Sequence, residues 1–251
     1  MIYALVGTGR MGAAVEIEAG RRGHRKVGEF DPGRGGSSSA TIDPSTLGRP
    51  EVAFEFTEPS AAEENLVTLL QAGIPVVCGT TGWNPTPKLE AALSGSEAGA
   101  IIAPNFSIGM LLFSRLTREA GRLLGSAGLH RPWIFESHHT GKKDAPSGTA
   151  RHLADLILEV DPRMRDVVVG NPDERLPEDA LQVVSLRSGS EPGTHTVGFD
   201  GEYDRITLSH RARSRAGFAI GAVIAAEWLV GKKGLHRFED VVDALLERPA
   251  S

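Results

Sequence analysis

Chemically active side chains are concentrated between residues 136 and 150, where the sequence reads ESHHTGKKDAPSGTA. The stretch contains two adjacent histidines, two adjacent lysines and a Pro-Ser-Gly-Thr segment. Histidine can exchange a proton near neutral pH, whereas lysine supplies a positive charge there. A solvated loop, a metal site, a phosphate-binding loop or a reaction centre would each use such residues.

The spacing of these residues argues against two of the four alternatives. A Walker-type loop, G-x-x-x-x-G-K, requires a glycine at position 136, which is Glu136. Adjacent side chains such as His138 and His139 point in different directions from an extended backbone, so they are poorly placed to bind one ion. We therefore expect neither a phosphate loop nor a metal ion at this stretch.

The end of the stretch predicts an anion-binding helix start. Apolar residues recur at helical spacing from Leu153 to Val160, and Ser147 precedes them in the position of an N-cap. The free backbone amides of Gly148 and Thr149 would then lie beside hydroxyl groups, an arrangement that binds anions. Together with the preceding cationic residues, this predicts a site for a small anion, with a carboxylate favoured.

A glycine-rich loop near the N-terminus predicts dinucleotide binding. VGTGRMG places Gly7, Gly9 and Gly12 in G-x-G-x-x-G spacing between a predicted strand and a predicted helix. The first glycine permits a tight turn, the second lets the backbone approach a pyrophosphate, and the third lets helix and strand pack closely. Asp31, at the end of the next predicted strand, would accept hydrogen bonds from ribose hydroxyls.

The choice of dinucleotide stays open between NADH and NADPH. Asp31 favours NAD, but Arg10 and Arg34 could pair with a 2′-phosphate. Two further glycine- or proline-containing segments, GTTG at 79–82 and APNFS at 103–107, follow predicted strands, and the carboxyl ends of strands are where ligands lie in open α/β sheets. A reductase of a small anion explains these features better than a protein that only binds.

The order of predicted elements indicates an α/β protein with an N-terminal Rossmann-type, doubly wound parallel sheet and an inserted α+β domain. In the first part of the chain apolar strands alternate with helices, beginning with the strands at 2–7, 26–30, 52–57, 74–80 and 100–106. Helices are predicted at 11–22 and after Ser60, which has capping-box spacing to Glu63. Residues 33–39, GRGGSSS, read as a loop.

Past residue 107 the pattern changes. A helix at 107–124, a strand at 131–137 and a helix at about 148–160 are followed by three strands with short connections, at 181–189, 194–199 and 205–213, which suggests antiparallel pairing. Residues 217–246 read as helical. We therefore predict a dinucleotide-binding domain from 1–106 plus 217–251, and a substrate-binding and oligomerisation domain at 107–216.

Composition limits the possible partners. The formal net charge is −5 and the pI about 5.9, which argues against nucleic acid or an anionic membrane as the main partner. No apolar run is long enough to span a bilayer, and the N-terminus has no signal-peptide pattern. The single cysteine, Cys78, lies in a buried-strand context and fits a reducing compartment, so a cytoplasmic location is expected.

The motifs together resemble the dihydrodipicolinate reductase family, nearly from end to end. The matching segments are GRMG at 9–12, FT-x-P at 56–59, GTTGW at 79–83, APNFSIGM at 103–110, E-x-HH-x-x-K-x-DAPSGTA at 136–150, G-x-H-x-V-x-F at 193–199 and H-x-A-x-x-R-x-x-FA-x-GA at 210–222. DAPSGTA is the most specific of them. The chain departs from many members in its shorter first glycine loop and in Arg187-Ser188-Gly189, where R-G-G is usual.

The resemblance implies roles for individual residues. His138 and Lys142 correspond to catalytic residues, and four residues to substrate contacts: His139, Ser147, Gly148 and Thr149. Lys143 falls on a variable position. The implied cofactor contacts are Gly7, Thr8, Gly9, Arg10, Met11, Gly12, Asp31, Gly79, Thr80, Thr81, Ala103, Pro104, Asn105 and Phe106.

The resemblance also implies an activity and an assembly. The reaction would be hydride transfer from NADH or NADPH to a cyclic, unsaturated dicarboxylate, with charge stabilisation and a proton from Lys142 and His138. The product would enter diaminopimelate and lysine synthesis, and the protein would be a homotetramer assembled through its inserted domain. Competing hypotheses are another two-domain Rossmann dehydrogenase acting on amino or keto acids, which would lack DAPSGTA, and a nicotinamide-binding sensor without turnover.

Overall fold

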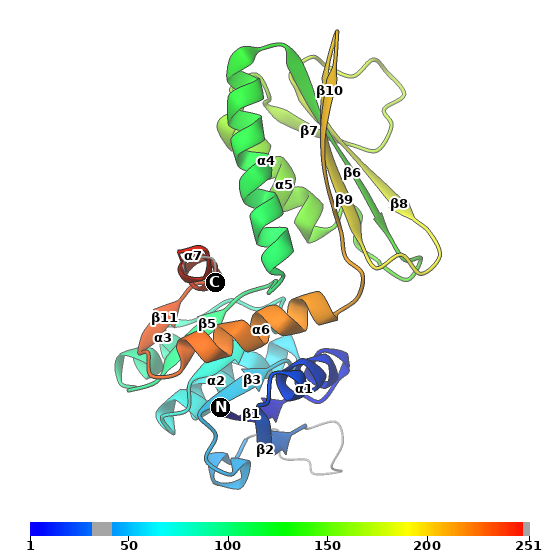
Figure 1. Cartoon of the computed structure of the whole chain (residues 1–251). Helices are drawn as coiled ribbons and strands as arrows, with labels where there is room; N and C mark the ends of the chain where they lie inside the picture. The colour runs from blue at the N-terminus through cyan, green and yellow to red at the C-terminus, as the bar shows by residue number, and fades with distance from the viewer. Residues whose placement is uncertain (32–41, 248–251) are drawn as a thin grey trace. The chain divides into compact units, whose positions relative to one another are not determined.

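The chain forms two compact units in a computed structural model that describes residues 1–31 and 42–247 (Figure 1). One unit comprises Met1–Ile108 and Arg215–Ser251, and the other comprises Gly109–Ser214. This division does not show what each unit binds, so the dinucleotide-binding and substrate-binding roles remain predictions here. Residues 33–39, predicted as a loop, lie outside the described residues.

The first unit is built on a parallel sheet of six strands in the order β11-β5-β4-β3-β1-β2. The strands are β1 (Ile2–Val6), β2 (Arg25–Phe30), β3 (Val52–Glu55), β4 (Val76–Cys78), β5 (Gly99–Ile102) and β11 (Gly234–His236). The central strands are buried along nearly their whole length because both faces of the sheet are covered, and they are apolar except for Glu55 at the end of β3. The predicted Rossmann-type sheet is confirmed.

The described part of this unit has five helices, and four of them form two pairs. They are α1 (Arg10–Arg21), α2 (Pro59–Gln71), α3 (Pro87–Ser94), α6 (Ala216–Leu229) and α7 (Phe238–Leu246), with a 3₁₀ turn at Pro44–Leu47. Helix α1 packs beside α6, and α2 beside α3. The crossover from β1 to β2 and those from β3 to β4 and β5 run in opposite directions along the sheet, so right-handed crossovers place α1 on one face and α2 and α3 on the other. Helix α6 lies on the face of α1 because it packs against that helix. The core under α2 and α3 is mostly apolar, with Leu66, Leu70 and Val76 all completely buried.

Two predictions in this unit are wrong. Residues 217–246 are not continuously helical, because β11 separates α6 from α7 and pairs with β5 at the sheet edge. Ser60 and Glu63 do not form a capping box: α2 begins after Glu58 with Pro59 in its first turn, and the Glu63 carboxylate accepts instead from the backbone N of Thr86. Proline suits the first turn, where no amide donor is needed, and it moves the helix start ahead of Ser60.

The second unit is a five-stranded sheet in the order β10-β9-β6-β8-β7 with two helices. The strands are β6 (His130–His138), β7 (Asp166–Val169), β8 (Ala180–Arg187), β9 (Thr194–Gly201) and β10 (Arg205–Arg211), and the helices are α4 (Ile108–Ala127) and α5 (Gly148–Val160). From Arg131 onward, residues along β6 alternate between half-buried and buried, as expected for a sheet with one face covered by helices. Met110, Phe113, Leu153 and Ile157 fill the core between the helices and the sheet.

The predicted antiparallel run of three strands is only partly correct. Strands β9 and β10 pair antiparallel, but β8 does not pair with β9. It pairs in parallel with β6 and with β7, so β6 lies between β8 and β9. Short connections suggest hairpins, but here β8 and β9 each pair with β6 instead of with each other. Within residues 1–31 and 42–247, no helix is both long enough and apolar enough to cross a membrane.

Candidate active site

The predicted reaction centre lies at the end of β6, on the face of the sheet that the helices cover. Glu136 and His138 occupy buried positions of the alternating pattern. The register places Ser185 of β8 and His195 of β9 beside Glu136, and Arg187 of β8 beside His138. Cross-strand neighbours point to the same face, so the register brings five polar side chains into one buried group.

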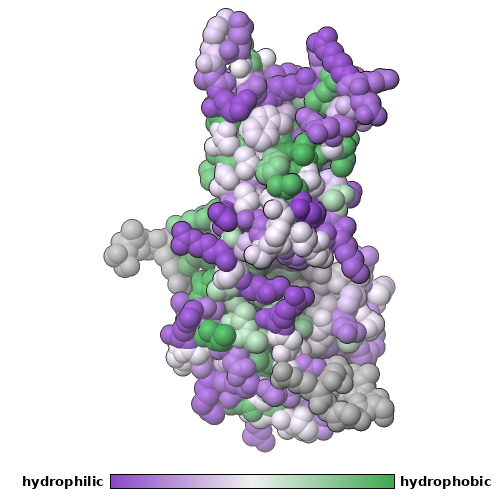
Figure 2. Space-filling view, turned by 90° about the vertical axis from the view of Figure 1, so that its right-hand side faces the viewer, coloured by the Kyte–Doolittle hydropathy of each residue, from purple (hydrophilic) through white to green (hydrophobic). Residues whose placement is uncertain are grey.

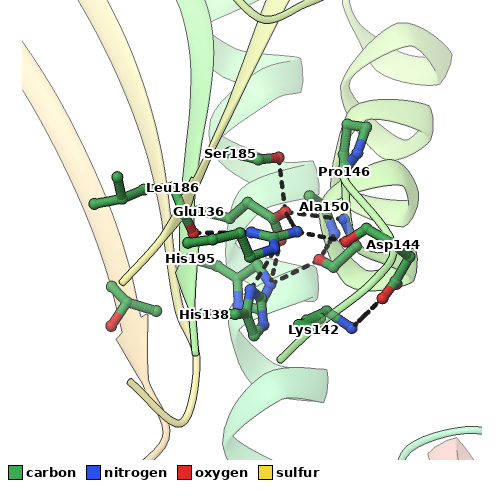
Figure 3. Close-up of polar contacts among 12 residues, drawn as sticks. Glu136, His138, Lys142, Asp144, Pro146, Ala150, Ser185, Leu186 and His195 are labelled. Carbon is green, nitrogen blue, oxygen red and sulfur yellow. Dashed lines mark hydrogen bonds and ion pairs between the residues drawn. The ribbon is translucent and has the colours of Figure 1, made fainter. Parts of the chain in front are cut away.

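The carboxylate of Glu136 is at the centre of this group and is completely buried (Figure 3). Its Oε1 accepts hydrogen bonds from Ser147 N at 2.9 Å, from Ser185 Oγ at 2.8 Å and from the Arg187 guanidinium at 3.0 Å. Burial alone would raise the pKa of Glu136, but the nearby His195 and the hydrogen bonds from Ser147 and Ser185 hold it well below its ordinary value. Glu136 is therefore an ionised carboxylate.

Two imidazoles face the other oxygen of the same carboxylate. Oε2 lies 3.3 Å from His138 Nδ1 and 3.5 Å from His195 Nε2. The rings meet edge to face with their centroids 5.0 Å apart. Burial lowers the pKa of His138 to about 4; Glu136 opposes this shift, while His195, Lys142 and Arg187 add to it. His138 is therefore neutral at pH 7 when no ligand is bound.

Glu136, His138 and His195 also satisfy a loose geometric test for a metal site, since their ligand atoms lie within 4.8 Å of one another. The electrostatics oppose a cation there. The Arg187 guanidinium already contacts Glu136, and three donors occupy Oε1. We therefore interpret the group as a carboxylate with two histidines, and the expectation that no metal takes part stays a prediction.

The helix start predicted at Ser147 is confirmed. Helix α5 begins at Gly148, and Ser147 Oγ accepts a hydrogen bond from Ala150 N at 3.1 Å. The same Oγ lies 3.2 Å from His195 Nε2. Gly148 is exposed and Thr149 half-buried, so both remain accessible at the first turn of the helix. An anion can thus reach the positive end of α5 beside the buried group.

The loop between β6 and α5 carries the other predicted residues. Lys142 Nζ lies 2.8 Å from the nearer carboxylate oxygen of Asp144, and the side chain is about one quarter exposed. The pKa of Asp144 lies below its ordinary value, mainly because of this hydrogen bond from Lys142. His139 and Lys143 are exposed. The close-up shows Lys142 on the loop that follows β6, pointing toward Asp144 (Figure 3).

Sequence reasoning assigned no role to three residues of this group: Glu136, Arg187 and His195. Glu136 and His195 belong to the E-x-HH and G-x-H motifs, so the motifs marked them without giving their chemistry. Only the register of β6 between β8 and β9 places them together. Gly193 was also missed as a contact: a Cβ there would lie 3.0 Å from His138 Nε2.

In the first unit, the glycine loop has the geometry that dinucleotide binding requires. Gly7 has φ +92°, and a Cβ on it would lie 2.2 Å from the carbonyl oxygen of Phe56. A Cβ on Gly12 would lie 2.1 Å from the carbonyl oxygen of Gly7, whereas one on Gly9 would meet nothing within 4 Å. Gly9 is the N-cap of α1 and makes no side-chain cap, so the helix start is open to an anion.

Asp31, which directly follows β2, is hydrogen-bonded to this glycine loop. Asp31 Oδ2 accepts hydrogen bonds from the backbone N of Thr8 at 2.8 Å and from its hydroxyl at 2.5 Å. Arg10 and Met11 begin α1, with Arg10 exposed. Arg34, the other candidate for a 2′-phosphate, lies outside the described residues. The structure therefore brings Asp31 to the glycine loop, which is what a ribose contact requires.

The remaining predicted cofactor residues follow β4 and β5 at the same edge of the sheet. They are Gly79, Thr80, Thr81, Ala103, Pro104, Asn105 and Phe106. A Cβ on Gly79 would lie 2.1 Å from the ring of Phe56. Thr80 links the loop after β3 to the loop after β4, since its Oγ1 donates to Glu55 at 2.6 Å and accepts from Thr57 N at 2.8 Å. The buried Glu55, which the sequence analysis did not single out, thus connects two of the loops.

The comparisons with known proteins bear on both units. Residues 1–106 match the model described as dihydrodipicolinate reductase, N-terminus, and residues 109–242 match dihydrodipicolinate reductase, C-terminus. The chain belongs to the dihydrodipicolinate reductase family. A 4-hydroxy-tetrahydrodipicolinate reductase from Christiangramia forsetii is 36% identical over 250 residues, which is 98% of this chain and 100% of the relative. One from Methanoculleus marisnigri is 39% identical over 197 residues, 77% of this chain and 76% of the relative.

Solved structures agree with membership of this reductase family. Dipicolinate-bound dihydrodipicolinate reductase from Paenisporosarcina sp. TG-14 superposes with a TM-score of 0.74 at 25% identity, over 94% of this chain and 97% of that one. An amine dehydrogenase from Mycobacterium smegmatis gives a TM-score of 0.59 at 14% identity, over 97% and 95% of the two chains, and shows the fold alone. The family resemblance predicted from the motifs is confirmed.

Proposed function

We propose that this protein reduces 4-hydroxy-tetrahydrodipicolinate to tetrahydrodipicolinate, with NADH or NADPH as the reductant, in the diaminopimelate route to lysine. Family membership over nearly the whole chain supports the reaction. The observation that carries it is the site on the second unit, where Glu136 contacts both Ser147 at the start of α5 and His138, and where Lys142 is near enough to affect the pKa of His138. Those groups suit a small dicarboxylate, and the related Paenisporosarcina reductase is described as dipicolinate-bound.

The substrate would be held by its carboxylates. The amides of Gly148 and Thr149 and the hydroxyls of Ser147 and Thr149 offer donors for one carboxylate, at the positive end of α5. Lys142 would move from Asp144 to the substrate, and the exposed His139 would contribute at the rim of the site. A dianion bound here adds negative charge near His138, which raises the pKa of that histidine toward neutrality.

The reaction consumes one hydride and one proton and releases water from the 4-hydroxy substrate. The reduced nicotinamide supplies the hydride. Lys142 stabilises the negative charge that develops on the substrate as hydride arrives, and His138, once its pKa has risen, supplies the proton. His138 is buried at the end of β6, where little water competes for its hydrogen bonds, and Lys142 lies on the loop that follows, where it is partly exposed.

The first unit is proposed to hold the dinucleotide, and the second to bind substrate and to oligomerise. Gly7–Gly12 and the start of α1 would contact the pyrophosphate, and Asp31 the ribose. The segments Gly79–Thr81 and Ala103–Phe106, at the carboxyl ends of β4 and β5, would face the nicotinamide half. With Arg34 outside the described residues, both NADH and NADPH stay in the proposal.

The proposed homotetramer would form through the sheet of the second unit. No described helix covers the outer face of this sheet, and half-buried or exposed side chains such as Trp133, Phe135, Val184 and Leu186 lie there in register. Apolar residues gather on the side of the second unit that the space-filling view presents (Figure 2). Because an exposed apolar face of this kind marks an interface, it supports self-association. The buried, unpaired Cys78 fits the proposed cytoplasmic location.

The direct test is to generate the substrate with dihydrodipicolinate synthase and to follow oxidation of NADH and NADPH by absorbance. Turnover is expected with at least one cofactor, and its absence with both would overturn the assignment. Lys142→Ala should lower kcat on the order of 10²-fold or more while leaving nucleotide affinity unchanged, because Lys142 faces the substrate. The neighbouring Lys143→Ala is the matched control and should keep near-normal rates. A sensor without turnover would bind nucleotide normally and show no oxidation in any of these assays.

A further inference from the structure

We propose that Glu136 is a positioning residue for the reaction: its buried carboxylate holds His138 with Nδ1 protonated and facing it, so that Nε2 is the nitrogen that exchanges a proton with the substrate. This inference rests on the proposed function and deepens it. It assigns a role to a residue that the motif includes but whose chemistry the motif does not give.

The hydrogen bonds of Glu136 determine which atom needs a proton. Oε1 already accepts from three donors, whereas Oε2 has no hydrogen-bond partner within the described residues and faces only the two imidazoles. A buried carboxylate oxygen without a donor is costly. His138 Nδ1, 3.3 Å away and itself without another partner in the described chain, is the donor best placed to satisfy it. The neutral imidazole has one N–H, so Nε2 then carries the lone pair.

The other edge of the His138 ring is kept open by Gly193. A Cβ on residue 193 would lie 3.0 Å from Nε2 and 3.1 Å from Cδ2, which is tighter than nine in ten real Cβ contacts. The backbone there has φ +147° and is fixed by a hydrogen bond from Ala212 N to Gly193 O at 2.9 Å. The absence of a side chain at Gly193 thus leaves room beside the nitrogen that would exchange the proton.

Glu136 also connects the histidine to the carboxylate-binding helix start. Its Oε1 accepts from Ser147 N, and His195 lies between its Oε2 and Ser147 Oγ. The Glu136 carboxylate therefore positions both the ring of His138 and the first turn of α5. The charged or titratable groups that face His138 are Glu136, His195, Lys142 and Arg187, and among them only Glu136 favours the imidazolium.

The tautomer of His138 tests this inference without relying on turnover. In protein labelled with ¹⁵N-histidine, the ring nitrogen shifts distinguish Nδ1–H from Nε2–H, and loss of one set of signals in His138→Asn assigns them. We expect Nδ1–H in the wild-type protein. Nε2–H in the wild-type protein would overturn the inference, and this measurement needs no variant of Glu136 that folds.

Glu136→Gln should reverse the tautomer. Three donors surround the Oε1 position, so the amide oxygen of the variant would take that place and the NH₂ group would face the histidines. An NH₂ group donates to the lone pair of His138 Nδ1, which favours Nε2–H. We expect this reversal together with a fall in kcat on the order of 10²–10⁴-fold, with an unchanged Kd for nucleotide, as for a histidine held in the wrong tautomer.

Asp161→Asn is the matched control. Asp161 is also completely buried in the second unit and paired with an arginine, Arg163, at 2.7 Å, but it lies at the end of α5 away from His138. The control should lose stability while keeping the His138 tautomer and kcat. Equal loss of kcat in both variants, or an unchanged tautomer in Glu136→Gln, would show a structural role alone. If wild-type protein shows no turnover, the proposed function fails, whereas a wrong tautomer in an active enzyme overturns only the role of Glu136.

Discussion

Replacement by alanine should have a different effect at each of three glycines, Gly9, Gly12 and Gly20. All are in or at the start of α1, and each would gain one methyl group on replacement by alanine. A Cβ on Gly12 would lie 2.1 Å from Gly7 O, so reaching an ordinary contact of 3.4 Å requires a movement of 3.4 − 2.1 = 1.3 Å between helix and loop. Gly9 and Gly20 have nothing within 4 Å of an added Cβ.

Gly12→Ala should therefore destabilise the protein, whereas Gly9→Ala should affect only the bound nucleotide. Overpacking of the Gly12 kind costs about 1–3 kcal/mol, which for a chain of this size lowers Tm by roughly 5 °C. Gly9 has φ −66°, which alanine adopts without strain, so its Tm should not change. Its methyl group would occupy the space that a pyrophosphate needs, and the Kd for NADH or NADPH should rise at least about tenfold, or 1.4 kcal/mol.

Gly20→Ala is the control on the same helix. Alanine in a helix interior is favoured over glycine by about 0.5–1 kcal/mol, so Tm should rise slightly and nucleotide affinity should stay the same. Thermal unfolding and fluorescence titration with each nucleotide measure both quantities. The reasoning is refuted if Gly9→Ala binds nucleotide as tightly as wild type, because the open helix start of α1 would then not be the pyrophosphate site.

Four further results are expected. Histidine in the unfolded chain becomes protonated below about pH 6.5, but His138 in the folded protein becomes protonated only near pH 4. As the pH falls between these values, the free energy of unfolding of the wild-type protein should decrease by at most about 3 kcal/mol relative to that of His138→Asn. Urea unfolding measures both proteins, and parallel plots of stability against pH would contradict the low pKa. Ser147→Ala should cost about 1 kcal/mol of stability and raise KM for the dicarboxylate, whereas the N-cap control Thr86→Ala in the first unit should cost stability without changing KM. Leu186→Asp should dissociate the oligomer in sedimentation velocity, while Leu123→Asp, exposed on α4, should not; an unchanged oligomer in the first variant would place the interface elsewhere. Treatment with a chelator should leave kcat unchanged, and loss of activity restored by zinc would mean that Glu136 and its two histidines bind a metal.

The features of the site that could be predicted from the sequence are those that depend on residues close together in the chain. The N-cap at Ser147 was predictable because a hydroxyl before an apolar helical period acts within one turn of the chain. The glycine loop was predictable for the same reason, since its glycines contact backbone only a few residues away, as Gly12 does with Gly7. Alternating strands and helices likewise predicted the parallel sheet, because handedness and burial leave few other arrangements.

Contacts between distant segments were decided by the tertiary structure alone. His195 approaches Glu136 because β9 pairs with β6, although 59 positions separate the two residues in the sequence (195 − 136 = 59). The position of β8 beside β6 rather than beside β9 brings Arg187 to the same carboxylate. The short connection between β8 and β9 predicted that these two strands pair, which is wrong, because the length of a loop does not show which strands pair in the sheet.

The sequence by itself thus determined the family, the nucleotide loop and the helix start that would hold a carboxylate. Only the fold decided that the ESHHTGKKDAPSGTA segment has a buried, ionised carboxylate behind its first histidine. The physical reason is that a charge at Glu136 becomes tolerable only when donors from β8 and from Ser147 at the start of α5 converge on it, and that convergence exists only in the folded structure.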